Sequence, residues 1–228
     1  MQFPHFAAAF GGMLHAGYAT QGYHAMPTPT DARRSAPAAD RNKEPILAVL
    51  RRVLPARGLV CEISSGTGQH VVHFAAALPD LTWQPSELDA RLHASIAAWI
   101  AHEGLANVRA PLALDVTADE WPLAHADAIL CINMIHIAPW DATLGLMGGA
   151  ARLLGPGGVL FLYGPYRRFG AHTAPSNEAF DASLRASDPE WGVRDMETVV
   201  EVAEERGFAL SEVVAMPANN FSVVLRRT

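Results

Sequence analysis

Along most of the chain, segments with continuous runs of apolar residues alternate with segments whose apolar residues have helical spacing. Short, nearly continuous apolar runs are typical of parallel strands buried on both faces, and they occupy residues 58–63, 81–85, 108–114, 126–132 and 158–163. Apolar residues three and four apart are typical of amphipathic helices, and this spacing covers residues 68–78, 90–103 and 140–154. The alternation predicts a doubly wound α/β fold, with helices on both faces of a parallel sheet.

The C-terminal part of the chain departs from this alternation. Helical spacing over residues 176–186 and 195–206 precedes two strand patterns, at 208–216 and 221–226. Only residues 217–220 separate these strands, which is too short for a crossover helix. We therefore expect a seven-stranded sheet whose last strand is antiparallel.

The first 40 residues have no stable period and are rich in Ala, Gly and Pro. We interpret residues 1–40 as a flexible leader and expect the folded domain over residues 41–228. Helical spacing resumes after Pro45, a residue that is tolerated in the first turn of a helix because its missing N–H would be unpaired there.

Composition narrows the class of protein. The chain has 228 residues, which suits one domain, and a net charge of −6, which disfavours nucleic acid as a partner. No apolar run approaches the ~20 residues of a membrane span, so no membrane association is expected. The two cysteines, Cys61 and Cys131, lie inside apolar runs, which favours free thiols and a cytoplasmic protein. The oligomeric state stays open.

A glycine-bearing turn follows the first apolar strand and carries the strongest chemical signal. It contains Glu62, Ser64, Gly66 and Gly68. A dinucleotide-binding turn needs a third glycine where this chain has Val71, and the Glu62 carboxylate would repel a diphosphate. S-adenosylmethionine has a cationic amino-acid head and no phosphate. The turn therefore favours S-adenosylmethionine over NAD.

Acidic residues also follow the next two apolar strands. Glu87 lies where doubly wound folds place a carboxylate on ribose hydroxyls, with Asp89 as a competitor that is equally suited to capping a helix. Asp115, followed by Val116, is suited to the exocyclic amine of adenine, although a lone Asp after a strand is commonly a turn former. As the third acidic position in series, Asp115 is interpreted as a cofactor contact.

These motifs together resemble the class I S-adenosylmethionine-dependent methyltransferases, including the Gly-Pro-Gly-Gly turn at residues 155–158. Ser64 departs from the pattern, because many members have glycine there. Further segments are similar to the methyltransferase-like protein 26 family, long catalogued as a domain of unknown function; they include residues 41–47, 65–70, 83–86, 133–137, 163–166, 172–177, 191–195 and 216–220. The resemblance implies a Rossmann-like class I methyltransferase fold and an S-adenosylmethionine cofactor, without a substrate.

Further cofactor contacts are expected at Asn42, His70 and Asn133. His136 is the leading candidate for a general base or a substrate-orienting residue, because it follows the fourth strand and histidine titrates near neutrality. The alternative is a ring that only packs on the cofactor or caps the following turn. His70 and His73 have a spacing that can bind a metal, but no further ligand stands at a recognisable interval, so no metal site is expected.

The acceptor is expected to contact residues of the last third of the chain. Residues 164–177 form a polar loop, interpreted as a lid, and the candidate substrate contacts are Tyr163, Tyr166, Arg167, His172 and Asn219. Arg167 is equally well explained as a solvated charge, and Asn219 as a turn residue. The sequence thus predicts a methyltransferase acting on a small molecule. The alternatives are a non-catalytic S-adenosylmethionine-binding module and an NAD-dependent oxidoreductase.

Overall fold

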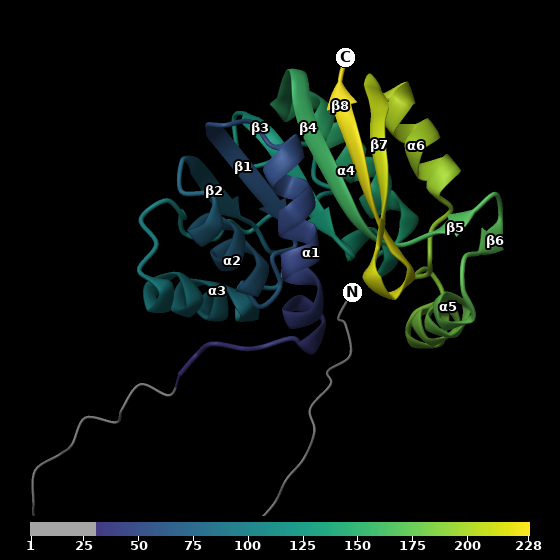
Figure 1. Cartoon of the computed structure of the whole chain (residues 1–228), viewed down its shortest axis with the longest axis horizontal. Helices are drawn as coiled ribbons and strands as arrows, with labels where there is room; N and C mark the ends of the chain where they lie inside the picture. Colours follow the sequence, from purple (N-terminus) through teal and green to yellow (C-terminus); the bar gives the residue numbers. More distant parts are fainter. Residues whose placement is uncertain (1–30) are drawn as a thin grey trace, which may run out of the picture. The chain divides into compact units, whose positions relative to one another are not determined.

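The computed structural model describes residues 31–228, which form an α/β fold around one mixed sheet (Figure 1). The sheet has six strands in the order β2-β1-β3-β4-β8-β7. Its parallel part consists of β1 (Gly58–Ile63), β2 (Leu81–Pro85), β3 (Ala126–Ile132) and β4 (Leu154–Pro165). β8 (Asn220–Arg227) is antiparallel to β4 and to β7 (Phe208–Met216). The predicted Rossmann-like fold with an antiparallel last strand is confirmed.

Helices cover both faces of the sheet. One face carries α1 (Pro37–Val53), α2 (Gln69–Ala77) and α3 (Ala90–Glu103), and α1 crosses in front of the sheet in Figure 1. The other face carries α4 (Trp140–Leu153) and α6 (Met196–Glu205). The remaining helix, α5 (Pro175–Ser187), lies beside the lower end of β7 and β8 in this view.

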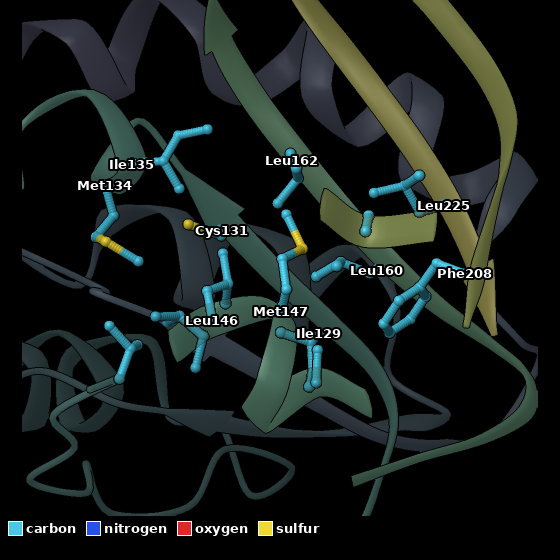
Figure 2. Packing of buried hydrophobic residues seen from close by; sticks show 14 of the residues in the cluster. Ile129, Cys131, Met134, Ile135, Leu146, Met147, Leu160, Leu162, Phe208 and Leu225 are labelled. Carbon is cyan, nitrogen blue, oxygen red and sulfur yellow. The ribbon is translucent and has the colours of Figure 1, made fainter. Parts of the chain in front are cut away.

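The strands divide their side chains between two hydrophobic clusters. Val60 and Phe161 point to the cluster under α1 and α2, whereas Cys61 and Leu160 point to the cluster under α4. Figure 2 shows how Leu160, Met147 and neighbouring side chains interdigitate in the second cluster. This alternation is the period of two expected of strands, and burial on both faces explains why the runs in the sequence are continuously apolar.

The expected strand at residues 108–114 is the one correction to the sheet. Its segment lies beside β2 and bonds to it through isolated bridges at Val108 and Leu112. Arg109 N–H donates to Trp83, but Pro111 has no N–H, and the next bond to β2 comes from Leu112 instead. The predicted seventh strand is therefore present in position but too irregular to count as a strand.

The start of the first helix also differs from the prediction. α1 begins at Pro37, so residues 37–40 are helical rather than part of an extended leader, and Pro45 lies inside the helix. Pro45 cannot donate to the carbonyl of Arg41, and burial of Ile46 and Leu50 under the helix offsets that loss. Residues 31–36 of the predicted leader are neither helix nor strand, and residues 1–30 lie outside the described residues.

Shorter elements complete the part that positions the site. The segment after β3 forms η1 (Met134–His136), and η2 (Pro217–Asn219) joins β7 to β8. The polar loop after β4 contains a small hairpin of β5 (Arg167–Arg168) and β6 (Ala171–His172). Among residues 31–228, no helix is long and apolar enough to cross a bilayer.

Candidate functional site

The glycine turn between β1 and α2 is held against the end of β2. Ser65 N–H donates to the carbonyl of Ser86 at 2.8 Å, and Ser86 N–H and Oγ both donate to the carbonyl of Glu62. Gly68 adopts φ +93°, and a Cβ there would lie 2.9 Å from Cα of Ile96. Glycine at this position therefore lets α2 and α3 pack closely. These bonds fix the turn at the carboxyl edge of the sheet.

Glu87 joins the second strand to the glycine turn. Its carboxylate accepts from Gly66 N–H at 2.9 Å through Oε2 and from Asp89 N–H at 3.0 Å through Oε1. A carboxylate has about four lone-pair sites, so acceptor capacity remains for two hydroxyl donors. The competing Asp89 instead caps α3 by accepting from Arg91 N–H. The structure thus brings Glu87, and not Asp89, to the turn.

Glu62 is buried at the end of β1, and its Oε2 has no hydrogen-bond partner among the described residues. Burial raises the pKa of this carboxyl to about 8, and the nearby Glu87 carboxylate adds to the shift. Residues 62–69 contain no Lys or Arg. An unpartnered carboxyl in this setting is suited to a ligand cation, which would lower its pKa, and is unsuited to a phosphate.

The backbone at Gly66 and at Ser64 determines how much space a ligand has above the glycine turn. A Cβ at Gly66, where φ is +56°, would meet no protein atom within 4 Å, so open space lies above the turn. Ser64 has φ +53°, a left-handed backbone that glycine adopts more readily than serine. Open space over Gly66 beside the orphaned Glu62 oxygen fits a cationic amino-acid head.

The N-terminal part of α1 lies against the start of α2. Asn42 Oδ1 accepts from Nε2 of His70 at 2.7 Å, and Gln69 bonds to Asp40 and to the N–H of Ala36. Burial lowers the pKa of His70 to about 4, so its ring is neutral at physiological pH. The structure therefore brings the predicted contacts Asn42 and His70 together beside the glycine turn.

Asp115 and Val116 lie in the segment after the irregular edge strand. Oδ1 of Asp115 accepts from the N–H and the hydroxyl of Thr117, which is the turn-forming role weighed as its alternative. Val116 is buried, and its carbonyl accepts from Nε1 of Trp121. Contact of these residues with adenine stays a prediction.

A cleft of about 980 Å³ opens at the carboxyl ends of β3 and β4. Four predicted site residues line it: Asn42, Asn133, Tyr163 and Asn219. Asn133 adopts φ +63°, a left-handed backbone that asparagine tolerates, and this conformation turns the chain out of β3 into η1. Open α/β sheets bind ligands at this edge, so the cleft is the candidate acceptor site.

His136 does not line the cleft. Its ring is fully buried, Nδ1 accepts from Arg194 N–H, and it packs edge-on against Tyr166 with the ring centroids 5.0 Å apart. A Cβ on Gly164 would lie 2.4 Å from its Nε2, so the backbone of β4 covers the ring. Burial also lowers the pKa of His136 to about 3. His136 therefore packs inside the protein, and the residue predicted as a base does not line the cleft.

Three predicted substrate contacts also lie away from the cleft. Tyr166 is fully buried in the core under α4. Arg167 N–H donates to the carbonyl of Arg194, which ties the hairpin to the segment before α6. His172 lies 3.5 Å from the carboxylate of Asp181. The loop after β4 is therefore anchored to neighbouring segments by the backbone of Arg167 and by the side chains of Tyr166 and His172.

The cleft contains residues that the sequence did not single out as ligand contacts. They include Arg41 on α1 and Asn177 and Phe180 on α5. Asn177 is buried and its amide donates to Thr173 Oγ1 and to the carbonyl of Asn219. Asn177 lies two residues after Pro175, the first residue of α5, but nothing in the sequence places α5 beside the β7–β8 connection.

Comparison with known families now places the chain. The family described as "Protein of unknown function (DUF938)" matches residues 33–227. The chain belongs to the DUF938 family. The match covers every element of the described fold, from α1 to β8, and includes the glycine turn and the cleft.

Several solved structures with a fold similar to this DUF938 chain are described as methyltransferases. An O-methyltransferase family protein from Burkholderia thailandensis has a TM-score of 0.72 at 18% identity, covering 84% of this chain and 57% of its own. Mitomycin 7-O-methyltransferase MmcR has a TM-score of 0.72 at 17% identity, and the match covers 84% of this chain and 54% of MmcR. Human N-acetylserotonin methyltransferase in complex with SAM has a TM-score of 0.69 at 13% identity, and the match covers 83% of this chain and 52% of the human protein. The chain spans little more than half of each, and the likeness shows a shared fold.

Proposed function

We propose that this protein is an S-adenosylmethionine-dependent methyltransferase that acts on a small molecule. The observation that carries the proposal is the pair of buried acidic side chains, Glu62 and Glu87, around the open space above Gly66. Glu62 would hold the cationic amino-acid head, and Glu87 would hold the ribose hydroxyls. The bound cofactor supplies a methyl group on a positively charged sulfur.

The chain's own residues would bind and orient both reactants. Asn133 follows β3, which is the strand between β1 and β4 in the sheet, and it lines the cleft. Alignment of two bound reactants accounts for ~7–11 kcal/mol of a barrier without a strong acid or base. The low-identity methyltransferase neighbours and the sequence motifs shared with the methyltransferase-like protein 26 family support this assignment. The buried free cysteines favour a cytoplasmic enzyme.

NAD-dependent oxidation is the less favourable assignment. The helix after the turn has Val71 in place of the third glycine, and Val71 is fully buried. No Lys or Arg lies within residues 62–69 to offset the negative charge of a diphosphate. A binding module without turnover shares the same cofactor site, so only a turnover measurement separates it from an enzyme.

Calorimetric titration with S-adenosylhomocysteine tests the proposal. We expect micromolar binding by the wild-type protein and loss of at least tenfold in affinity for Glu87→Ala. Asp119→Asn is the matched control, because it removes an exposed carboxylate away from the glycine turn and should leave binding unchanged. NAD binding without S-adenosylhomocysteine binding would overturn the proposal.

A further inference from the structure

The cleft presents apolar side chains to solvent. Ile137 and Phe180 are large hydrophobic residues that are 44% and 42% exposed, and both line the cleft. They come from different elements, since Ile137 follows η1 and Phe180 lies on α5. Pro217 adds further exposed apolar surface. A ligand with an apolar body would remove this surface from water.

The polar groups of the cleft are amides and hydroxyls, and one side chain carries a charge. That side chain is Arg41, at the α1 wall. Asn42, Asn133 and Asn219 present amides, and burial raises the pKa of the Tyr163 hydroxyl above its usual value, so it remains a proton donor. Among the described residues that line the cleft, none has a carboxylate or an imidazole.

This set of groups cannot remove a proton from an acceptor at neutral pH. The nearest predicted base, His136, is covered by the backbone at Gly164, and its Nδ1 is already an acceptor for Arg194 N–H. An alkyl alcohol or a protonated amine needs a base before it becomes a nucleophile. A protonated amine would also meet the positive charge of Arg41. Both classes fit the cleft poorly.

We propose that the acceptor is a small molecule with an apolar body whose reacting oxygen or sulfur is already an anion at neutral pH, as in an acidic phenol or an aryl thiol. This inference rests on the proposed function. The acceptor loses its proton to solvent before binding. Its lone pair forms the bond to the methyl carbon as the carbon–sulfur bond of the sulfonium breaks, and the electron pair of that bond stays on sulfur. No proton moves within the cleft.

Binding of matched probes to the protein saturated with S-adenosylhomocysteine tests the charge requirement without turnover. The probes are 4-nitrophenolate, 4-nitrothiophenolate and 4-nitroaniline, which share one aromatic body and differ in the charge and identity of the reacting atom. We expect the anionic probes to bind at least tenfold more tightly than the amine. The stronger of the two anions identifies the preferred atom, oxygen or sulfur.

Two substitutions separate the roles of charge and apolar surface. Arg41→Gln should weaken binding of the anionic probes by about tenfold and leave 4-nitroaniline unchanged. Arg51→Gln removes the same charge from an exposed position nearer the C-terminus of α1, away from the cleft, and should change neither. Phe180→Ala should weaken the binding of all three probes by a similar factor.

Turnover with S-adenosylmethionine provides the second readout. For phenols of different acidity, the rise of rate with pH should follow the pKa of each acceptor and not one common value. Failure of S-adenosylhomocysteine to bind would overturn the proposed function. Normal S-adenosylhomocysteine binding together with equal affinity for the amine, no binding of any probe, or a common pH midpoint would overturn this inference alone.

Discussion

Ser64 shows how one residue carries local strain in the glycine turn. Its φ of +53° lies in the left-handed region, which costs a residue with a Cβ roughly 1–2 kcal/mol relative to the right-handed one. Glycine adopts this backbone without that cost. The position is close to Glu62 and Gly66, so its conformation is fixed by the turn that holds the candidate cofactor site.

Ser64→Gly is expected to stabilise the protein by about 1 kcal/mol, after part of the relieved strain is lost to the greater freedom of glycine in the unfolded chain. Urea denaturation measures the change. Ser64→Ala is the control, because it removes the hydroxyl and keeps the Cβ, and it should give no gain. Equal stabilisation by both substitutions would show that the hydroxyl, and not the backbone, was the unfavourable group.

The raised pKa of Glu62 predicts that the stability of the protein falls as pH rises. Its pKa is about 8 in the folded protein against 4.5 for the free group, so the stability it contributes is full below pH 4.5 and is lost as pH rises through 8. Relative to Glu62→Gln, which stays neutral, the wild-type melting temperature should fall between pH 6 and pH 9. Parallel curves for the two proteins would contradict the raised pKa.

The same group links pH to cofactor affinity. The ammonium group of S-adenosylhomocysteine prefers the ionised carboxylate, so its affinity should increase as pH rises towards 8 in the wild-type protein. Glu62→Gln should bind weakly and should lack this increase. Calorimetry at several pH values measures both effects.

At the scale of elements, α4 approaches the segment of residues 116–121 through its glycines. A Cβ on Gly149 would lie 2.1 Å from the ring of Trp121, and one on Gly145 would lie 2.3 Å from the carbonyl of Val116. These residues are one helical turn apart and share a face. The close approach covers Trp121, which is part of the core under α4.

Gly148 and Gly149 form a matched pair for testing this packing. Gly148→Ala should stabilise the protein by up to about 1 kcal/mol, because alanine favours the helix and the nearest atom to its Cβ is 3.5 Å away. Gly149→Ala should destabilise it by about 1–3 kcal/mol through overpacking. Chemical denaturation compares the two. Higher stability of both variants would mean that Trp121 moves aside freely.

Elements with a strong local pattern could be predicted from the sequence, including the bounds of β1, β2, β3, α3 and β7. The first turns of α1 could not, because residues 37–40 are held by tertiary bonds from Gln69 that leave no periodic signal. The same distinction holds in the site. Glu87 follows from its strand end, whereas the burial of His136 depends on Gly164 and Arg194, which are distant in sequence.

At the scale of the whole molecule, the two hydrophobic clusters lie on opposite faces of one sheet and share its strands. Leu50 and Leu146 are fully buried, one in each cluster. Because β1, β3, β4 and β8 contribute side chains to both clusters, neither cluster can be lost while the other keeps its sheet. The described domain is expected to unfold as one cooperative unit.

Leu50→Ala and Leu146→Ala test this expectation. Each should cost about 2–5 kcal/mol and should shift the urea transitions seen by far-ultraviolet circular dichroism and by tryptophan fluorescence to the same midpoint. Separate midpoints for the two probes in either variant would show that the faces unfold independently.

The irregular edge beside β2 has a consequence for behaviour at high concentration. A regular outer strand is a template on which a strand of another molecule can pair and start aggregation. On one side of the sheet, the outer segment of residues 108–114 pairs with β2 only through isolated bridges, and on the other side a register shift between Leu210 and Glu212 interrupts β7. Both outer margins are therefore poor templates, which protects a core rich in β-branched residues from intermolecular strand addition.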